Sequence, residues 1–88
     1  MAKEYYFVEM TDTFGGEANY CWARRYKIRA FSLRGVAQIM SRLTGIQWHQ
    51  VDHYCDSARY DSRSGSTCFF VDTWDEDTHS HYRHEVIN

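Results

Sequence analysis

Residues 20–45, YCWARRYKIRAFSLRGVAQIMSRLTG, decide the fold class of this chain. Their first part, residues 20–30, alternates apolar and polar side chains, which predicts a half-buried antiparallel strand. One face is apolar (Tyr20, Trp22, Tyr26, Ile28 and Ala30), with Arg24 as the exception. The other face carries the basic side chains Arg25, Lys27 and Arg29. We therefore expect these cations on the solvent side of the strand.

The second part of this stretch predicts a helix over residues 33–44. Ser32 stands where an N-cap is expected, since its hydroxyl can accept a hydrogen bond from an early backbone N–H. Gly45 follows the last helical residue, where glycine is favoured. Apolar side chains recur between these caps at helical spacing: Leu33, Val36, Ala37, Ile39, Met40 and Leu43. This stripe is expected to pack on the apolar face of the strand.

Further strands are predicted on both sides of this unit. Residues 5–11 read as a first strand, followed by a glycine-containing loop over residues 12–19. Residues 46–54 read as a strand with a bulge or an early turn, anchored by Trp48 and Val51. Residues 58–74 read as a hairpin that ends at the acidic residues 75–77. The polar tail, residues 78–88, is expected either to fray or to add a short edge strand.

These elements predict one compact α+β domain over residues 1–88. The expected order is β-β-α-β-β, with an antiparallel sheet of about four strands and one helix packed on one face. The opposite sheet face is expected to be polar and available. A chain of 88 residues has room for one domain. It shows neither a signal peptide nor the roughly 20 apolar residues of a membrane helix, which predicts a soluble cytoplasmic protein.

Charge is segregated along the chain, although the formal net charge is only −2. Residues 1–17 carry a net −3, and residues 52–88 carry a net −5. Residues 18–51 contain six basic side chains and no acid. Such a pattern bears on partners and on steering rather than on fold. Either the basic middle pairs with its acidic flanks across neighbouring strands, or the folded molecule keeps a basic and an acidic face.

Two groups of charged residues are the candidate partner-binding sites. The basic group consists of Arg24, Arg25, Lys27, Arg29 and Arg34. The acidic group consists of Asp72, Asp75, Glu76 and Asp77. Arg25, Lys27 and Arg29 of the strand, with Arg34 and Arg42 of the helix, can follow a phosphate backbone. Tyr5, Tyr54 or Tyr60 are then the exposed aromatics that stack bases. The acidic group can instead occupy a basic groove made for nucleic acid, or simply keep the hairpin ends soluble.

No motif in the chain specifies a reaction or a cofactor. Its three cysteines, Cys21, Cys55 and Cys68, are irregularly spaced, which indicates buried small side chains rather than a disulfide framework or zinc site. His79, His81 and His84 lie near acidic residues, but a solvated polar tail is favoured over a metal site. A relay built on Cys68 lacks a local nucleophile signature. We therefore expect no enzyme activity, no metal, no cofactor and no small-molecule substrate.

The whole chain resembles the small proteins encoded by bacteriophages and other mobile elements, among them anti-CRISPR inhibitors. The resemblance is one of size and element order: a first strand (EYYFVEM), a glycine loop (DTFGGEANY), a long strand with one helix (AFSLRGVAQIMSRLTG), then a hairpin and a charged tail. It implies a non-enzymatic inhibitor that binds and blocks a bacterial CRISPR effector complex. The alternative is a direct nucleic-acid-binding module that uses the basic strand and helix.

Overall fold

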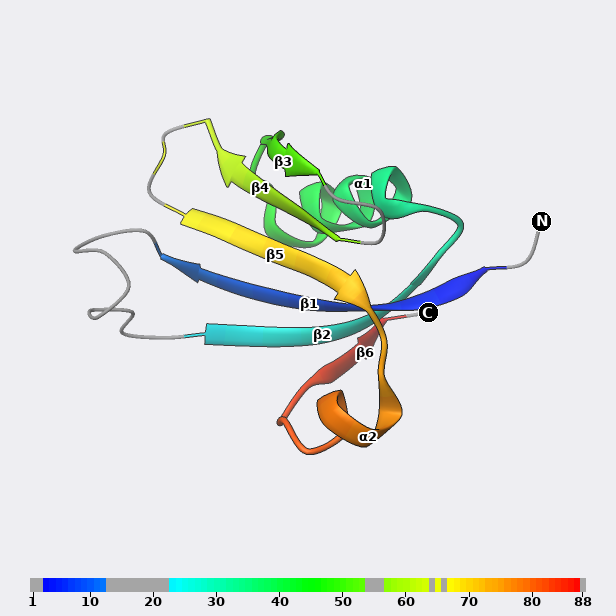
Figure 1. Ribbon diagram of the computed structural model, residues 1–88. Coiled ribbons are helices and arrows are strands. Elements are labelled where there is room, and N and C mark those ends of the chain that lie inside the picture. Colours follow the sequence, from blue (N-terminus) through cyan, green and yellow to red (C-terminus); the bar gives the residue numbers. More distant parts are fainter. Residues whose placement is uncertain (1–2, 13–22, 54–56, 64, 66, 88) are drawn as a thin grey trace.

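The computed structural model describes residues 3–12, 23–53, 57–63, 65 and 67–87 (Figure 1). The elements are β1 (Glu4–Asp12), β2 (Ala23–Ala30), α1 (Leu33–Thr44), β3 (Trp48–His53), β4 (Ala58–Ser62), β5 (Thr67–Thr73), α2 (Glu76–His79) and β6 (Glu85–Ile87). The six strands form one sheet in the order β3-β4-β5-β1-β2-β6. The first strand of the chain therefore lies inside the sheet, between β5 and β2.

The fold class is confirmed as α+β, but the sheet is larger than predicted and is mixed. The described residues form six strands where about four were expected. Five of them pair antiparallel, whereas β6 runs parallel to β2 along Tyr26–Ile28. The tail predicted to fray or to add an edge strand thus supplies the edge strand β6. Residues 75–77, predicted only to end a strand, instead begin a second helix, α2.

The helix α1 has the predicted bounds because both of its caps form. The Ser32 hydroxyl accepts a hydrogen bond of 3.2 Å from the Gly35 N–H, which satisfies one of the donors left unpaired at a helix start. Gly45 takes φ 73°, and its N–H donates to the Ser41 carbonyl. A left-handed residue at this point favours glycine. These local interactions explain why the sequence alone located the helix.

The core lies between α1 and one face of the sheet. Val36 and Met40 are fully buried on the helix. They pack with alternate strand residues: Tyr6, Val8 and Met10 of β1, and Tyr26, Ile28 and Ala30 of β2. The predicted apolar face of β2 is thus confirmed for residues 26–30. Leu43, the last member of the apolar stripe predicted on the helix, is 44% exposed rather than buried.

At the other edge of the sheet, β3 departs from its prediction at one anchor. The expected bulge is present, since the pairing with β4 shifts between Gln50 and Asp52. Trp48 packs against the core, edge-on to Phe69 at 4.7 Å between ring centroids. Val51, predicted as the second anchor, is 44% exposed instead. Every residue of β3 after Trp48 is exposed, so Trp48 is the residue that anchors this strand.

Tyr60 is a further correction, because it was predicted to be an exposed aromatic. It is 7% exposed and stacks on Phe69 with ring centroids 4.9 Å apart. Burial raises the pKa of the Tyr60 hydroxyl above its ordinary value of 10.0, and the charge of Arg34 acts in the opposite direction. Tyr60 therefore belongs to the core rather than to a base-stacking surface, whereas Tyr54 lies outside the described residues.

The sheet face opposite α1 was predicted to be polar and available, but part of it carries aromatic side chains. Figure 1 shows α2 beside β6, at the end of the molecule away from α1. The segment around α2 places aromatic side chains against Phe7 of β1. Part of the face expected to be available is therefore covered. Within the described residues, no helix is long and apolar enough to cross a membrane.

Candidate interaction surface

Three of the four cations of β2, Arg25, Lys27 and Arg29, project from the sheet face opposite α1, as the alternation predicted. Each is paired by register with a β1 residue: Arg25 with Glu9, Lys27 with Phe7, and Arg29 with Tyr5. Arg25 Nε lies 2.7 Å from Glu9 Oε2, and the guanidinium also lies 4.8 Å from the Tyr82 ring centroid. Arg25 is thus the member of the basic group that forms an ion pair with an acid on the neighbouring strand.

Lys27 is held by aromatic rings. Its Nζ lies 4.5 Å from the ring centroid of Tyr5 and 4.6 Å from that of Trp74. Both distances fall within the range of attraction between a cation and a ring face. Arg29 is exposed, with its guanidinium carbon 6.0 Å from the Tyr5 ring centroid. On the face opposite α1, this strand therefore carries one ion-paired, one aromatic-bound and one exposed cation.

The other two members of the predicted basic group lie elsewhere. Arg24 pairs by register with Met10, so it belongs to the sheet face that carries the core, at the end of β2. Arg34 lies on α1 and lines a depression with Trp48 and Tyr60. The structure brings Arg25, Lys27 and Arg29 together, but it does not add Arg34 to them.

The acidic group lies beside the basic strand rather than on a separate face. Asp72 of β5 pairs by register with Phe7, which in turn pairs with Lys27 on the other side. Asp75 caps α2, accepting hydrogen bonds from the Asp77 N–H at 3.2 Å and the Thr78 hydroxyl at 3.0 Å. Glu76 accepts from the Trp74 indole N–H at 2.7 Å. Two of the four acids therefore stabilise the local fold around α2.

An aromatic cluster that the sequence did not reveal joins these two groups. It consists of Phe7, Trp74, His79, Tyr82 and His84. The His79 ring stacks on Phe7 with centroids 4.1 Å apart, and its Nδ1 accepts a hydrogen bond from the Asp75 N–H. His84 lies 4.9 Å from Trp74. The C-terminal histidines were expected to lie in a solvated polar tail rather than in a metal site, whereas His79 and His84 pack here as rings.

Among the described residues, no three His, Cys, Asp or Glu side chains are grouped as a metal site requires. Cys68 is fully buried on β5, as predicted. Cys21, Cys55 and the glycine loop of residues 13–19 lie outside the described part of the chain.

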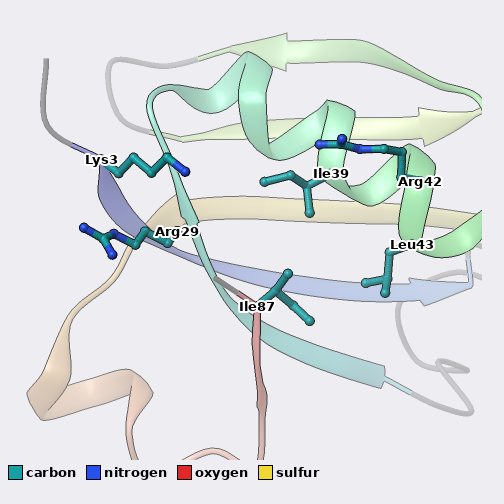
Figure 2. Close-up of a pocket in the computed structure, with 6 residues that line it drawn as sticks. All are labelled: Lys3, Arg29, Ile39, Arg42, Leu43 and Ile87. Atoms are coloured by element: carbon teal, nitrogen blue, oxygen red, sulfur yellow. The ribbon is translucent and has the colours of Figure 1, made fainter.

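A basic groove is the second feature that the sequence did not predict (Figure 2). It lies between α1 and the ends of β1, β2 and β6, and its volume is about 400 Å³. Its lining is Lys3, Arg29, Ile39, Arg42, Leu43 and Ile87. Lys3 and Arg42 extend toward each other above Ile39, whereas the Arg29 guanidinium turns outward. The residues come from distant parts of the chain, so no local sequence pattern predicts the groove.

Comparison with known proteins gives no relative for this chain. No family model, no curated protein and no solved structure matches it. The function must therefore be argued from the surface itself.

Proposed function

We propose that this chain is a small non-enzymatic binding protein that blocks a bacterial nucleic-acid-handling complex in the cytoplasm of the host. A CRISPR effector complex is the partner that the resemblance to phage-encoded inhibitors suggests. The charged surfaces of the sheet and helix make the contact. The observation that carries this proposal is that the basic and acidic groups do not neutralise each other.

The pattern of ion pairs supports this view. Within the described residues the salt bridges are Arg25–Glu9 and Arg59–Asp61. Neither joins a member of the basic group to a member of the acidic group. Arg24, Arg29 and Arg34 are exposed, as are all four acids. Charged side chains that form no salt bridge within the described residues can meet complementary charges on another protein.

The arrangement also suits a small inhibitor. An interface of standard size covers about 800 Å² on each partner, and the whole chain exposes 5913 Å². Because Asp72, Phe7 and Lys27 follow one another across three neighbouring strands, one footprint can include both signs of charge. Arginine and aromatic side chains are the usual energetic centres of such interfaces.

A pull-down from a bacterial lysate that contains CRISPR systems tests the proposal. The tagged chain is incubated with and without nuclease, and captured proteins are identified by mass spectrometry. We expect a defined effector complex that survives nuclease treatment. Loss of every partner after nuclease would overturn the inhibitor proposal.

Charge reversal then tests the assigned residues. One variant reverses Arg24, Arg29 and Arg34 to Glu, and a second reverses Asp72 and Asp77 to Lys; Asp75 and Glu76 are spared because they support α2. The control reverses Asp52 and Arg63, which are exposed and outside both groups. At least one test variant should lose the partner while the control retains it. Retention by both test variants contradicts the site assignment.

Direct nucleic-acid binding is the second candidate, and one observation favours it. Tyr5, 36% exposed, lies beside Lys27 and Arg29 on one sheet face. An aromatic ring next to cations is the arrangement that binds single-stranded nucleic acid. This function predicts binding of a labelled oligonucleotide that weakens steeply as salt rises, because phosphate contacts release counterions. Salt-independent binding, or none, would reject it.

A further inference from the structure

We propose that the basic groove between α1 and β6 binds an acidic protein segment, seating one aliphatic side chain of that segment between flanking carboxylates. The site differs from the charged groups discussed above, with which it shares only Arg29. It does not depend on the identity of the partner as a CRISPR effector. The argument rests on the floor of the groove, on its rim and on its charge balance.

The floor of the groove is aliphatic. Ile39 and Leu43 of α1 and Ile87 of β6 point into the same space (Figure 2). Leu43 is 44% exposed, although it continues the apolar stripe whose other members meet the core. A volume of about 400 Å³ accommodates a large side chain. An apolar group placed here would remove Leu43 from water.

The rim of the groove is positively charged, and no carboxylate of the described residues forms a salt bridge with it. Lys3, Arg29 and Arg42 form a salt bridge with no described carboxylate. Glu4, the acid next to Lys3 in the chain, is not paired with any of them. Lys3 Nζ also lies 5.2 Å from the ring centroid of Phe31, which is 56% exposed. Lys3 and Arg42, whose charged ends extend toward each other (Figure 2), are complementary to a ligand that carries several negative charges.

The aliphatic floor of the groove favours a protein segment over a nucleic acid as the ligand. Single-stranded nucleic acid is held by stacking of its bases on flat aromatic rings, whereas the groove presents branched aliphatic side chains. Phe31, an exposed aromatic residue that does not line the groove, has Lys3 over its ring. A branched floor under a cationic rim fits a leucine or isoleucine with glutamate or aspartate on either side.

Nuclear magnetic resonance of the whole chain tests the inference, with the methyl groups of Ile39, Leu43 and Ile87 as reporters. The probes are the capped peptides EELEE and EEGEE, which differ only in the central residue, at millimolar concentration. We expect EELEE to shift these methyl signals and to bind about tenfold more tightly than EEGEE, because only EELEE buries an aliphatic side chain. Equal binding of the two peptides, or no shift with either, overturns the proposal.

Two matched pairs of variants locate the site. Arg42→Glu is compared with Arg34→Glu, since both arginines are exposed on α1. Leu43→Asp is compared with Val51→Asp, since Leu43 and Val51 are equally exposed at 44%. The Arg42 and Leu43 variants should lose EELEE binding, and the Arg34 and Val51 variants should retain it. The reverse pattern, or equal loss in all four, excludes the groove.

Other occupants are separated in the same experiment. A thymidine oligonucleotide that displaces EELEE and shifts the same methyl signals more strongly would assign the groove to nucleic acid instead. Shifts of these signals on dilution without any peptide would assign it to a second copy of this chain. Either outcome overturns the acidic-segment proposal, and both are independent of the pull-down that tests the inhibitor function.

Discussion

Lys27 is the charged residue whose environment differs most from what the sequence indicated. It was expected on a solvent-exposed face, yet its ammonium group lies between the rings of Tyr5 and Trp74. Alternation along a strand predicts the face on which a side chain lies, and this was correct. It contains no information about what distant segments place over that face.

This environment makes Lys27→Glu more destabilising than reversal of a fully exposed charge. Each contact between a cation and a ring contributes about 0.5–1 kcal/mol, so we expect a loss of about 1–2 kcal/mol in the free energy of unfolding. Urea denaturation measures it. Arg34→Glu, which changes the net charge equally at an exposed site on α1, is the control. A loss no larger than that of the control would contradict the role of the two rings.

Tyr60 predicts a dependence of stability on alkaline pH. Its pKa is raised in the folded state by burial, so the unfolded chain releases this proton first as pH rises. The contribution of Tyr60 is therefore complete below the ordinary value of 10.0 and declines as pH rises through the folded pKa. In Tyr60→Phe the alkaline loss of unfolding free energy should be smaller than in the original chain. An identical pH profile for both proteins would contradict this.

Among the elements, α1 and the segment from α2 to β6 show what sequence can and cannot provide. The bounds of α1 follow from Ser32, Gly45 and the apolar stripe, all within one segment. In contrast, β6 is a three-residue strand whose pairing depends on β2. A strand that short has no recognisable pattern of its own, so its existence could not be predicted with certainty.

The candidate site likewise has features that the sequence could predict and features that it could not. The positions of Arg25, Lys27 and Arg29 on one strand face could be predicted, because that requires only a period of two. The aromatic cluster and the basic groove could not, since the first joins Phe7 to residues 74–84 and the second joins Lys3 to Ile87. Such contacts depend on the strand order, which local spacing does not encode.

Trp74→Ala should release the segment from α2 to β6 while the rest of the sheet stays folded. The indole contacts Phe7, His79 and His84, and its N–H donates to Glu76. Its removal therefore takes away much of what holds α2 against the sheet. Hydrogen exchange should become faster in residues 76–87 and remain unchanged in β5 and β1.

Val51→Ala provides the control, because Val51 is an exposed side chain on the opposite edge strand β3. Exchange that accelerates uniformly over the whole sheet in Trp74→Ala would show that the aromatic cluster belongs to the main core rather than to a separate unit.

At the scale of the whole molecule, the net charge of −2 conceals a surface on which both signs are exposed. Long-range attraction between charged surfaces accelerates association and is screened by salt. For the partner captured in the pull-down, we expect the association rate to fall as salt rises, with a smaller change in the dissociation rate. Biolayer interferometry over a salt series measures both. A salt effect confined to dissociation would exclude steering by these charges.

The strand order has a consequence for how the chain folds while it is being synthesised on the ribosome. β1 is made first and can pair with β2 as soon as Ala30 has emerged, but its other edge is paired by β5, where Tyr6 meets Thr73. Until residues 67–73 have left the exit tunnel, the nascent chain holds an unpaired edge in the middle of its future sheet. Such edges attract foreign strands. The interval between synthesis of β2 and of β5 is therefore when this edge is open to pairing with foreign strands.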